Sequence, residues 1–310
     1  MSNSALTKTL SRLPRYRRVD NALELRISPA RHSILAVLGR YDHLVARQIN
    51  CLLARSPASL TSTQEHLKLL FHAGYIQRLW LPTVTPMGSS MAIYCLDNKG
   101  YQYLAHAGLE PSGRFRASEL VQREFAFLRH HLQAIDLLVL AERLAQRYQE
   151  VSLARMRTER QLRQEPILLG SGKSRVRVVP DGWVDLRVGV LQHCLAFELD
   201  RGTERKNKIQ SKVKHLLECS GAPYQQAFGT TSLTVAWVVS EGGDGRVEEL
   251  VRWSEEVLRS AGTTHEADLF RFAAFDPSEI EPGHAFFGAL WRRPFDGRLI
   301  PLIGEDNGGA

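Results

Sequence analysis

The sequence contains few cysteines and none of the paired spacings that mark a metal or disulfide site. Its four cysteines, Cys51, Cys95, Cys194 and Cys219, stand far apart, with no CxxC motif and no Cys/His pairing. Structural zinc sites and small disulfide-rich secreted domains both depend on such spacings. We therefore expect reduced thiols and a cytoplasmic protein.

Long apolar runs are also missing. No stretch approaches the roughly 20 apolar residues that a membrane-spanning helix needs. The basic N-terminal segment is not followed by the apolar core of a secretory signal. The sequence thus predicts a protein without a membrane partner.

Several nucleotide-binding and catalytic motifs are absent as well. The chain has no glycine-rich dinucleotide motif and no nucleophile elbow. The segment SGKS at 171–174 resembles the end of a P-loop, but the upstream glycine is missing and the segment precedes a predicted strand, not a helix. These absences argue against a P-loop nucleotidase, a dinucleotide-dependent oxidoreductase and an α/β-hydrolase.

What the chain does have is a localised excess of positive charge. Its 310 residues carry a formal net charge of +7, enough length for two ordinary domains. Residues 1–50 contain nine Lys and Arg against three Asp and Glu, and residues 201–214 contain six against one. Such clusters suit a polyanion, because neutralising phosphates releases condensed counterions. The alternative is a solvated surface that has no partner.

The first part of the chain has the pattern of a winged helix-turn-helix domain. After a basic flexible arm at 1–24, the pattern over 25–112 predicts a helix from about Ser28, a helix at 44–54 and a helix at 61–73 that Gly74 ends. Two apolar runs then flank a Pro-, Gly- and Ser-rich loop at 82–90, which indicates a β-hairpin with that loop as the wing.

In this arrangement the third helix would enter the major groove of DNA, and the arm would follow the phosphate backbone. The alternative is a winged helix that mediates protein contacts. The residues expected to contact DNA are Arg15, Arg17 and Arg18 of the arm, with Ser62, Thr63, Gln64, His66 and Lys68 of the helix.

Residues 113–150 are predicted to hold a long connecting helix, because 117–149 contain no Gly or Pro. Its apolar content suggests burial against both domains or a dimer contact. His130, His131 and Asp136 lie within it, and we interpret them as packing or capping residues. The alternation of strands and helices over 151–303 then predicts an α/β domain with a mixed sheet, and a disordered tail follows at 304–310. The fold class is thus α+β with an α/β second domain.

The second domain contains a cluster of acidic residues on adjacent predicted strands. Asp181 lies in VVPDG, while Glu198 and Asp200 stand two apart in FELD and so project from one face of their strand. Carboxylates at the end of a buried strand are costly unless they are paired or bind a metal. Together the three supply hard oxygen ligands for Mg²⁺ or Mn²⁺, and Glu159 is a candidate fourth acid at the rim.

Residues of about 155–240 resemble the PD-(D/E)XK nuclease superfamily. Asp181 matches the aspartate of its motif and Glu198 the second acid, but Asp200 occupies the lysine position. Some members carry that lysine on the following helix, where Lys208 and Lys212 are candidates. The resemblance implies a restriction-endonuclease-like domain with catalytic residues among these five. The alternative is an inactive scaffold whose acids pair with Arg201, Arg205 or helix lysines.

A winged helix, a long helix and PDG…FELDRGTE…K together resemble the replication-relaxation family of plasmid, phage and integrative-element proteins. That resemblance implies a DNA-binding role in replication or mobilisation of a mobile element. Three hypotheses follow: an accessory protein that binds double-stranded DNA, a Mg²⁺-dependent endonuclease, and a winged-helix transcriptional regulator. Expected partners are duplex DNA, proteins of a replication or mobilisation complex, and a second copy of the chain.

Overall fold

The computed structural model describes residues 13–54, 56–80, 91–111, 125–170 and 175–304. The chain divides into two compact units, Met1–Arg129 (the first unit) and His130–Ala310 (the second unit). The predicted wing at 82–90 and the predicted tail from 305 onward lie outside the described residues, as does the SGKS segment. Among the described residues, no helix combines the length and the apolar character needed to cross a membrane.

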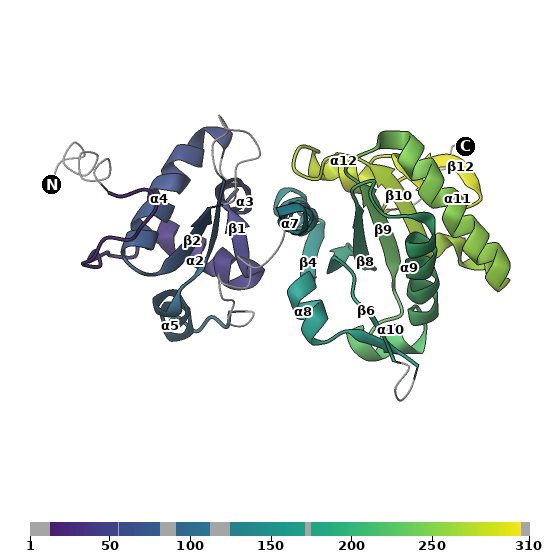
Figure 1. Cartoon of the computed structure of the whole chain (residues 1–310), viewed down its shortest axis with the longest axis horizontal. Coiled ribbons are helices and arrows are strands. Elements are labelled where there is room, and N and C mark those ends of the chain that lie inside the picture. Colours follow the sequence, from purple (N-terminus) through teal and green to yellow (C-terminus); the bar gives the residue numbers. More distant parts are fainter. Residues whose placement is uncertain (1–12, 55, 81–90, 112–124, 171–174, 305–310) are drawn as a thin grey trace. The chain divides into compact units, whose positions relative to one another are not determined.

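The first unit combines helices with a small antiparallel sheet (Figure 1). Its elements are α2 (Pro29–Tyr41), β1 (His43–Val45), α3 (Ala46–Leu52), the 3₁₀ turn η1 (Pro57–Ser59), α4 (Leu60–His72), β2 (Ile76–Trp80), β3 (Ala92–Leu96) and α5 (Asn98–His106). The strands pair in the order β1-β3-β2.

Local sequence signals explain where these elements begin and end. The Ser28 side chain caps α2 by accepting from the Arg31 backbone N–H, and Pro29 occupies the first helical turn. Gly74 has φ +83° just after α4, a conformation that favours glycine. The predicted hairpin is confirmed by the antiparallel register of β2 and β3, in which Arg78 lies opposite Tyr94.

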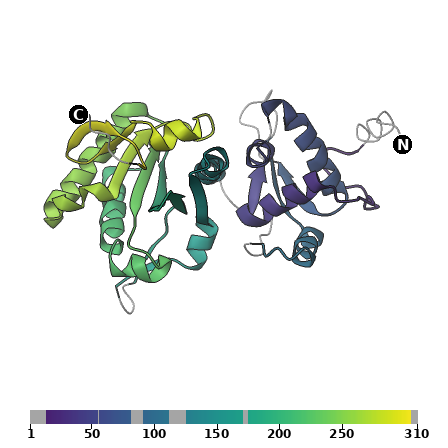
Figure 2. The same ribbon diagram turned by 180° about the vertical axis from the view of Figure 1, so that it is seen from behind.

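The second unit is built on a seven-stranded mixed sheet (Figures 1 and 2). Its elements are α7 (Phe125–Arg147), β4 (Val151–Thr158), α8 (Glu159–Gln164), β5 (Ile167–Leu169), β6 (Val176–Val178), β7 (Gly182–Val188), β8 (Leu191–Asp200), α9 (Lys206–Cys219), α10 (Ala222–Phe228), β9 (Thr234–Val239), α11 (Gly243–Ala261), η3 (Thr264–Leu269), β10 (Phe270–Ala274), α12 (Pro282–Phe287), β11 (Trp291–Arg293) and β12 (Asp296–Ile300).

The sheet order is β12-β11-β10-β9-β8-β7-β4, with a separate pair β5-β6. The central strands β8, β9 and β10 run parallel and the remaining neighbours antiparallel. Parallel neighbours require a crossover, which α9 and α10 provide between β8 and β9, and α11 between β9 and β10. The predicted mixed sheet is therefore confirmed.

Helices cover the sheet from two sides. Cys194 and Ala196 of β8 pack in one apolar cluster with Ile209 of α9 and Leu250 of α11. The intervening β8 residues face the other way, as the strand's period of two requires. On that other side α7 comes close to β7, because a Cβ at Gly182 would lie 2.9 Å from the Leu138 side chain. Glu198 and Asp200 are separated from Ala196 by an even number of positions on β8. Their side chains therefore project from the same face as Ala196, toward α9 and α11.

The end of the chain differs from its prediction. Apolar runs near 269–275 and 288–291 predict a strand at each of these positions. The first is confirmed as β10, but the second begins only at Trp291, and the short helix α12 and the strand β12 were not predicted. Pro282 starts α12, and the Glu281 side chain caps it by accepting from the His284 backbone N–H, a capping signal that the hydrophobic pattern alone does not show.

Candidate functional site

Asp181 stands at the point where β7 begins beside the end of β8. Its backbone N–H donates to the Phe197 carbonyl at 2.9 Å. One carboxylate oxygen, Oδ2, accepts from the Leu199 backbone N–H at 2.8 Å, and the other, Oδ1, lies 3.1 Å from Nε2 of His130 on α7. Both carboxylate oxygens are thus held in fixed directions.

Glu198, near the end of β8, lies against a lysine of the next helix. Its side chain is only 5% exposed, and its Oε2 lies 3.2 Å from Nζ of Lys212 on α9. Lys212 also lies 3.2 Å from the Glu204 carboxylate. Of the two lysines expected to replace the missing motif lysine, Lys212 is therefore the one beside Glu198. Lys208 instead pairs with Glu204 at 2.5 Å.

Burial and mutual repulsion separate the pKa values of the two acids. Burial, helped by the negative charge of Asp181, raises the pKa of Glu198 to about 7 against the opposing effect of Lys212. Burial would also raise the pKa of Asp181, but the hydrogen bond and charge of His130 hold it below its ordinary value.

Lys212, which lies between Glu198 and Glu204, stays positively charged. Burial acts to lower the pKa of Lys212, yet the surrounding carboxylates, Glu198 first, raise it above its ordinary value. A lysine ammonium between carboxylates with divergent pKa values is typical of functional sites, although structural ion pairs also produce such shifts.

A pocket of about 450 Å³ opens beside this pair. Glu198 and Lys212 line it together with His215 of α9, and two arginines, Arg163 and Arg177, stand in its wall. The Arg177 guanidinium donates to the Arg163 backbone carbonyl at 2.6 Å. The pocket therefore combines an acid and a lysine with further basic side chains, which suits a phosphate-bearing ligand.

Asp200 was expected to complete a three-carboxylate metal site, but its side chain serves an ion pair. Its Oδ2 accepts from Nε of Arg246 on α11 at 2.6 Å, and both side chains are buried. Arg246 also donates to the Glu204 backbone carbonyl at 2.6 Å and to the Glu249 carboxylate at 2.9 Å. A buried carboxylate needs such a partner, and this pairing engages Oδ2, while Oδ1 is buried without a hydrogen-bond partner among the described residues.

The two histidines interpreted as packing or capping residues are polar partners of the acids. His130 contacts Asp181, as described, and the charge of that carboxylate contributes to raising the pKa of His130 although burial opposes the change. His131 Nδ1 lies 2.7 Å from Oε2 of Glu159, which also binds Arg163. The adjacent pair on α7 thus reaches two acids, contacts that the interpretation of His130 and His131 as packing or capping residues did not include.

Glu159 supports a pH prediction. Burial would raise its pKa, but the hydrogen bond and charge of His131, with the charge of Arg163, lower it. A lowered folded-state pKa stabilises the fold above the unfolded value of about 4.3, and the stabilisation is lost as pH falls through the folded value. We expect Glu159→Gln to reduce the free energy of unfolding by about 1.5–3 kcal/mol at pH 7 and by less at pH 3, in urea titrations at both values.

The matched control is Glu165→Gln, since Glu165 is 76% exposed and pairs with Arg157. Exposed pairs contribute about 0–1 kcal/mol, so this variant should differ little from the original chain at either pH. Equal effects of the two substitutions at pH 7 would contradict the assignment of Glu159 as a buried, charged partner.

The acidic side chains of this site provide some of the oxygen ligands that a divalent cation requires. Among the described residues, no three His, Cys, Asp or Glu side chains gather closely enough to hold a metal by themselves. Asp181 and Glu198 remain as two neighbouring hard oxygen donors that influence each other's ionisation. Mg²⁺ is commonly bound by one or two carboxylates while it keeps several waters, so these two acids match its needs without Asp200.

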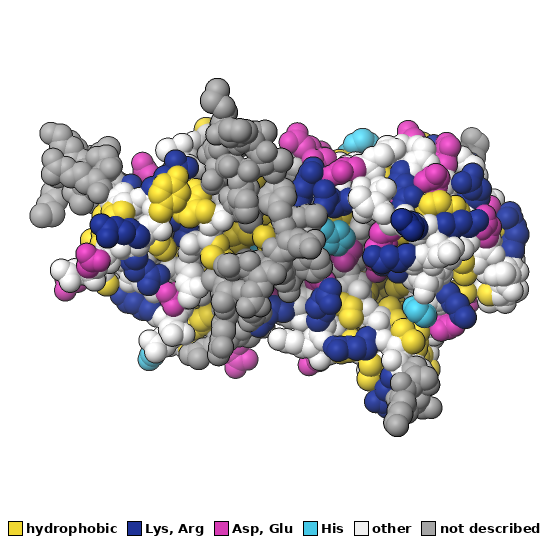
Figure 3. Space-filling model, viewed as in Figure 1, with side chains coloured by type: hydrophobic (Ala, Val, Ile, Leu, Met, Phe, Trp, Pro, Cys, Tyr) yellow, Lys and Arg dark blue, Asp and Glu magenta, His cyan; other side chains and the backbone are white. Residues whose placement is uncertain are grey.

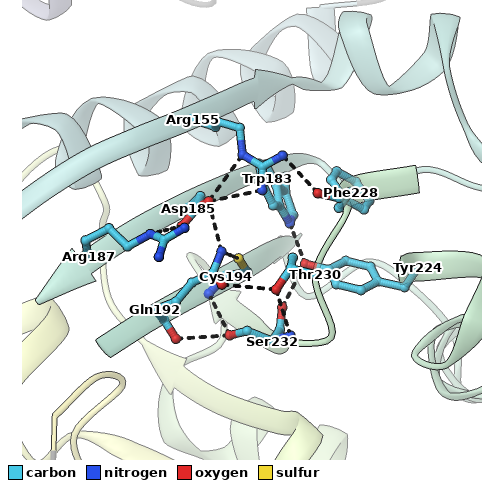
Figure 4. Close-up of polar contacts among 10 residues, drawn as sticks. All are labelled: Arg155, Trp183, Asp185, Arg187, Gln192, Cys194, Tyr224, Phe228, Thr230 and Ser232. Atoms are coloured by element: carbon cyan, nitrogen blue, oxygen red, sulfur yellow. Dashed lines mark hydrogen bonds and ion pairs between the residues drawn. The ribbon is translucent and has the colours of Figure 1, made fainter. Parts of the chain in front are cut away.

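Asp185 is another buried acid of the same sheet, and it has a structural role (Figure 4). Its carboxylate accepts from Nε of Arg155 at 3.2 Å, Nε of Arg187 at 3.2 Å and Nε2 of Gln192 at 3.0 Å. The Arg155 guanidinium also lies 5.1 Å from the ring centre of Trp183. With its lone pairs engaged by strand neighbours, Asp185 joins β4, β7 and β8 and is not a candidate ligand.

The predicted DNA-contacting residues of α4 separate into exposed and buried positions. Ser62 and Gln64 are exposed, while His66 and Lys68 are half-buried. Thr63 is fully buried and its hydroxyl donates to Asn50 Oδ1 at 2.8 Å. The expectation that Thr63 faces DNA is therefore wrong, because its side chain points toward α3.

The arm residues also differ from one another. Arg15 and Arg17 are exposed. Arg18 is instead tied to the body of the first unit, since its guanidinium lies 2.9 Å from Asp97 Oδ2 and 2.8 Å from the Ile76 carbonyl. Arg18 thus anchors residues 13–24 to β2 and α5, and the described part of the predicted arm is docked at that point.

A protein family and solved structures are similar to this chain. A family model described as replication-relaxation matches residues 35–232, more than half of the chain. None of the curated proteins compared with the chain matches it. The structure of restriction endonuclease FokI is similar at 11% identity and a TM-score of 0.26, covering 81% of this chain and 42% of that one. FokI bound to DNA is similar at 10% identity and a TM-score of 0.25, covering 79% and 48%. This chain spans less than half of either.

Proposed function

This chain belongs to the replication-relaxation family, and we propose that it binds double-stranded DNA in the replication or mobilisation of a mobile genetic element. The observation that carries the proposal is the polar and basic face of α4, where Ser62 and Gln64 are exposed and Lys68 is half-buried. Arg15 and Arg17 add two exposed positive charges to the same unit. Surfaces of this kind bind phosphate and read base edges.

The order of elements supports a winged helix in the first unit. Three helices, α2, α3 and α4, are followed directly by the β2–β3 hairpin. In such domains the helix before the hairpin enters the major groove. That helix is α4, whose apolar side packs inward through Leu67 and Leu70 and leaves its polar side for DNA.

The test is the salt dependence of duplex binding. The logarithm of the binding constant should fall linearly with the logarithm of salt concentration, because bound phosphates release counterions. Arg15→Ala with Arg17→Ala should reduce the magnitude of that slope by about 2, roughly 0.9 for each lost phosphate contact. Fluorescence anisotropy with a labelled duplex at several salt concentrations measures the slope.

The control variant is Arg26→Ala with Arg40→Ala, which removes the same charge from exposed positions of the same unit. It should leave the slope close to that of the original chain. If both double variants change the slope equally, the arm has no specific role. If the chain binds no duplex even at low salt, the proposal fails.

A second candidate function is cleavage of DNA by the second unit as a restriction-endonuclease-like domain. The observation that favours it is the position of Lys212, 3.2 Å from Glu198 in a pocket with basic walls. Asp181 and Glu198 would hold Mg²⁺ or Mn²⁺, which polarises a phosphodiester and lowers the pKa of an attacking water. Lys212 would stabilise negative charge that develops on the phosphate, and Arg163 and Arg177 would hold the strand.

Nicking of supercoiled plasmid tests this candidate. The chain should nick the plasmid when Mg²⁺ or Mn²⁺ is added and not with EDTA, and Glu198→Gln should abolish the reaction. Glu218→Gln serves as the matched control, because Glu218 lies on α9 with a side chain that is 47% exposed and pairs with Lys214. Equal nicking by the original chain and Glu198→Gln would remove the enzyme hypothesis and leave the DNA-binding proposal standing.

A further inference from the structure

A groove in the first unit combines basic side chains with an aromatic wall. It has a volume of about 620 Å³ and lies between α4 and the β2–β3 hairpin. Arg15, Lys68 and Arg78 line it together with Trp80 and Tyr94, and no acidic residue is among the described residues of its lining. Its size falls within the roughly 300–1,000 Å³ of ordinary ligand pockets. In Figure 3, basic and hydrophobic side chains adjoin one another on the first unit.

The β2–β3 hairpin holds these side chains in a fixed order. Arg78 and Trp80 are two apart on β2 and so face the same side, and Tyr94 lies opposite Arg78 on β3. The Arg78 guanidinium carbon is 4.2 Å from the ring centre of Phe71 and 5.2 Å from that of Trp80. Arg78 therefore lies between two aromatic rings, Phe71 and Trp80, at the wall of the groove.

The arm adds a second, more exposed aromatic ring. Tyr16 is 67% exposed, and its ring centre lies 5.2 Å from that of Trp80 at an angle of 58°. The Arg15 guanidinium carbon stands 4.8 Å from the Trp80 ring. Tyr16 thus places an exposed aromatic ring beside Trp80 and the basic side chain of Arg15.

The basic residues lie close enough to repel one another. Burial lowers the pKa of Lys68, and the charge of Arg78 lowers it further. Burial lowers the pKa of Arg78 as well, and the charge of Arg15 adds to that lowering. Like charges held together at a groove create a positive potential that an anion relieves. The groove thus offers phosphate recognition beside a stacking surface.

We propose that this groove holds an unpaired nucleotide of DNA, with its base against Tyr16 and Trp80 and its phosphate against Lys68 and Arg78. In the interior of a duplex both faces of each base are covered by its neighbours, whereas an unpaired or extruded base offers an open face on which an aromatic side chain can stack. The inference rests on the proposed DNA binding and adds to it a preference for duplexes that carry a single-stranded segment.

The test compares a blunt duplex with the same duplex carrying a single-stranded tail, both by fluorescence anisotropy with the full chain. The tailed duplex should bind more tightly. Tyr16→Ala should weaken binding of the tailed duplex about tenfold, a typical factor for one stacked base, and leave the blunt duplex unchanged, while Tyr16→Phe should behave like the original chain. Trp80→Ala should act in the same direction as Tyr16→Ala.

A 2-aminopurine in the tail gives a direct readout, because stacking on an aromatic ring quenches its fluorescence. Quenching should be lost in Tyr16→Ala and kept in Arg26→Ala, which alters an exposed residue of the same unit that does not line the groove. Equal affinity for blunt and tailed duplexes, with no effect of Tyr16→Ala, would overturn the inference and leave duplex binding intact. Absence of binding to either DNA would instead remove the proposed function itself.

Discussion

Replacing Arg246 with alanine is expected to lower the free energy of unfolding of the second unit by about 3–5 kcal/mol, the range for breaking a buried ion pair. The substitution leaves the Asp200 carboxylate, which is 1% exposed, without its ion-pair partner in the interior. It also removes a donor to the Glu204 carbonyl, which lies in the connection between β8 and α9. Urea unfolding followed by tryptophan fluorescence measures the loss.

A matched control lies on the same helix. Arg259 pairs with Glu255 in an exposed i,i+4 ion pair, with its side chain 60% exposed, so Arg259→Ala should cost less than about 1 kcal/mol. Replacing both buried partners, Asp200→Leu with Arg246→Met, should recover much of the stability, because apolar residues of similar size often substitute well for buried pairs. An Arg246→Ala loss as small as that of Arg259→Ala would contradict the role assigned to the pair.

Local patterns in the sequence predict much of the fold, because capping and periodicity act over a few residues. The predicted start of a helix near Ser28 is confirmed by α2, and the predicted end at Gly74 by α4. The same patterns failed for Thr63, which was counted with its polar neighbours. A threonine of α4 can face inward when a buried partner is available, and Asn50 of α3 provides it. The distance along the chain between the two hides this contact.

In the candidate site, too, local sequence patterns did not predict contacts between residues that are distant along the chain. The spacing of Glu198 and Asp200 correctly predicted a shared strand face, but not that each would take a different helix as partner. Arg246 lies 46 residues beyond Asp200, and no local motif links them. His130 lies 51 residues before Asp181, and its helical surroundings indicated packing rather than a polar contact. Such long-range pairs depend on the order of strands in the sheet, which periodicity does not determine.

For the proposed cleavage of DNA by the second unit, Lys212→Met is expected to reduce nicking by about a hundred- to a thousandfold, the cost of removing one group that stabilises transition-state charge. Lys212 is the lysine that contacts Glu198, and its raised pKa keeps it charged at neutral pH. Methionine keeps most of the length of the side chain and removes the charge. Initial rates of plasmid nicking in Mg²⁺, with urea unfolding of the same preparations, measure the change in activity against any change in stability.

Lys208→Met is the control that the chain itself offers. Lys208 lies one turn before Lys212 on α9, and both lysines pair with Glu204, but the Lys208 side chain is 66% exposed and Glu198 is paired with Lys212. Its replacement removes the same charge from the same helix, so the nicking rate should fall less than about threefold, the scale of a weak exposed ion pair. A comparable loss in both variants would mean that α9 contributes only general positive charge, and that Lys212 has no special part in cleavage.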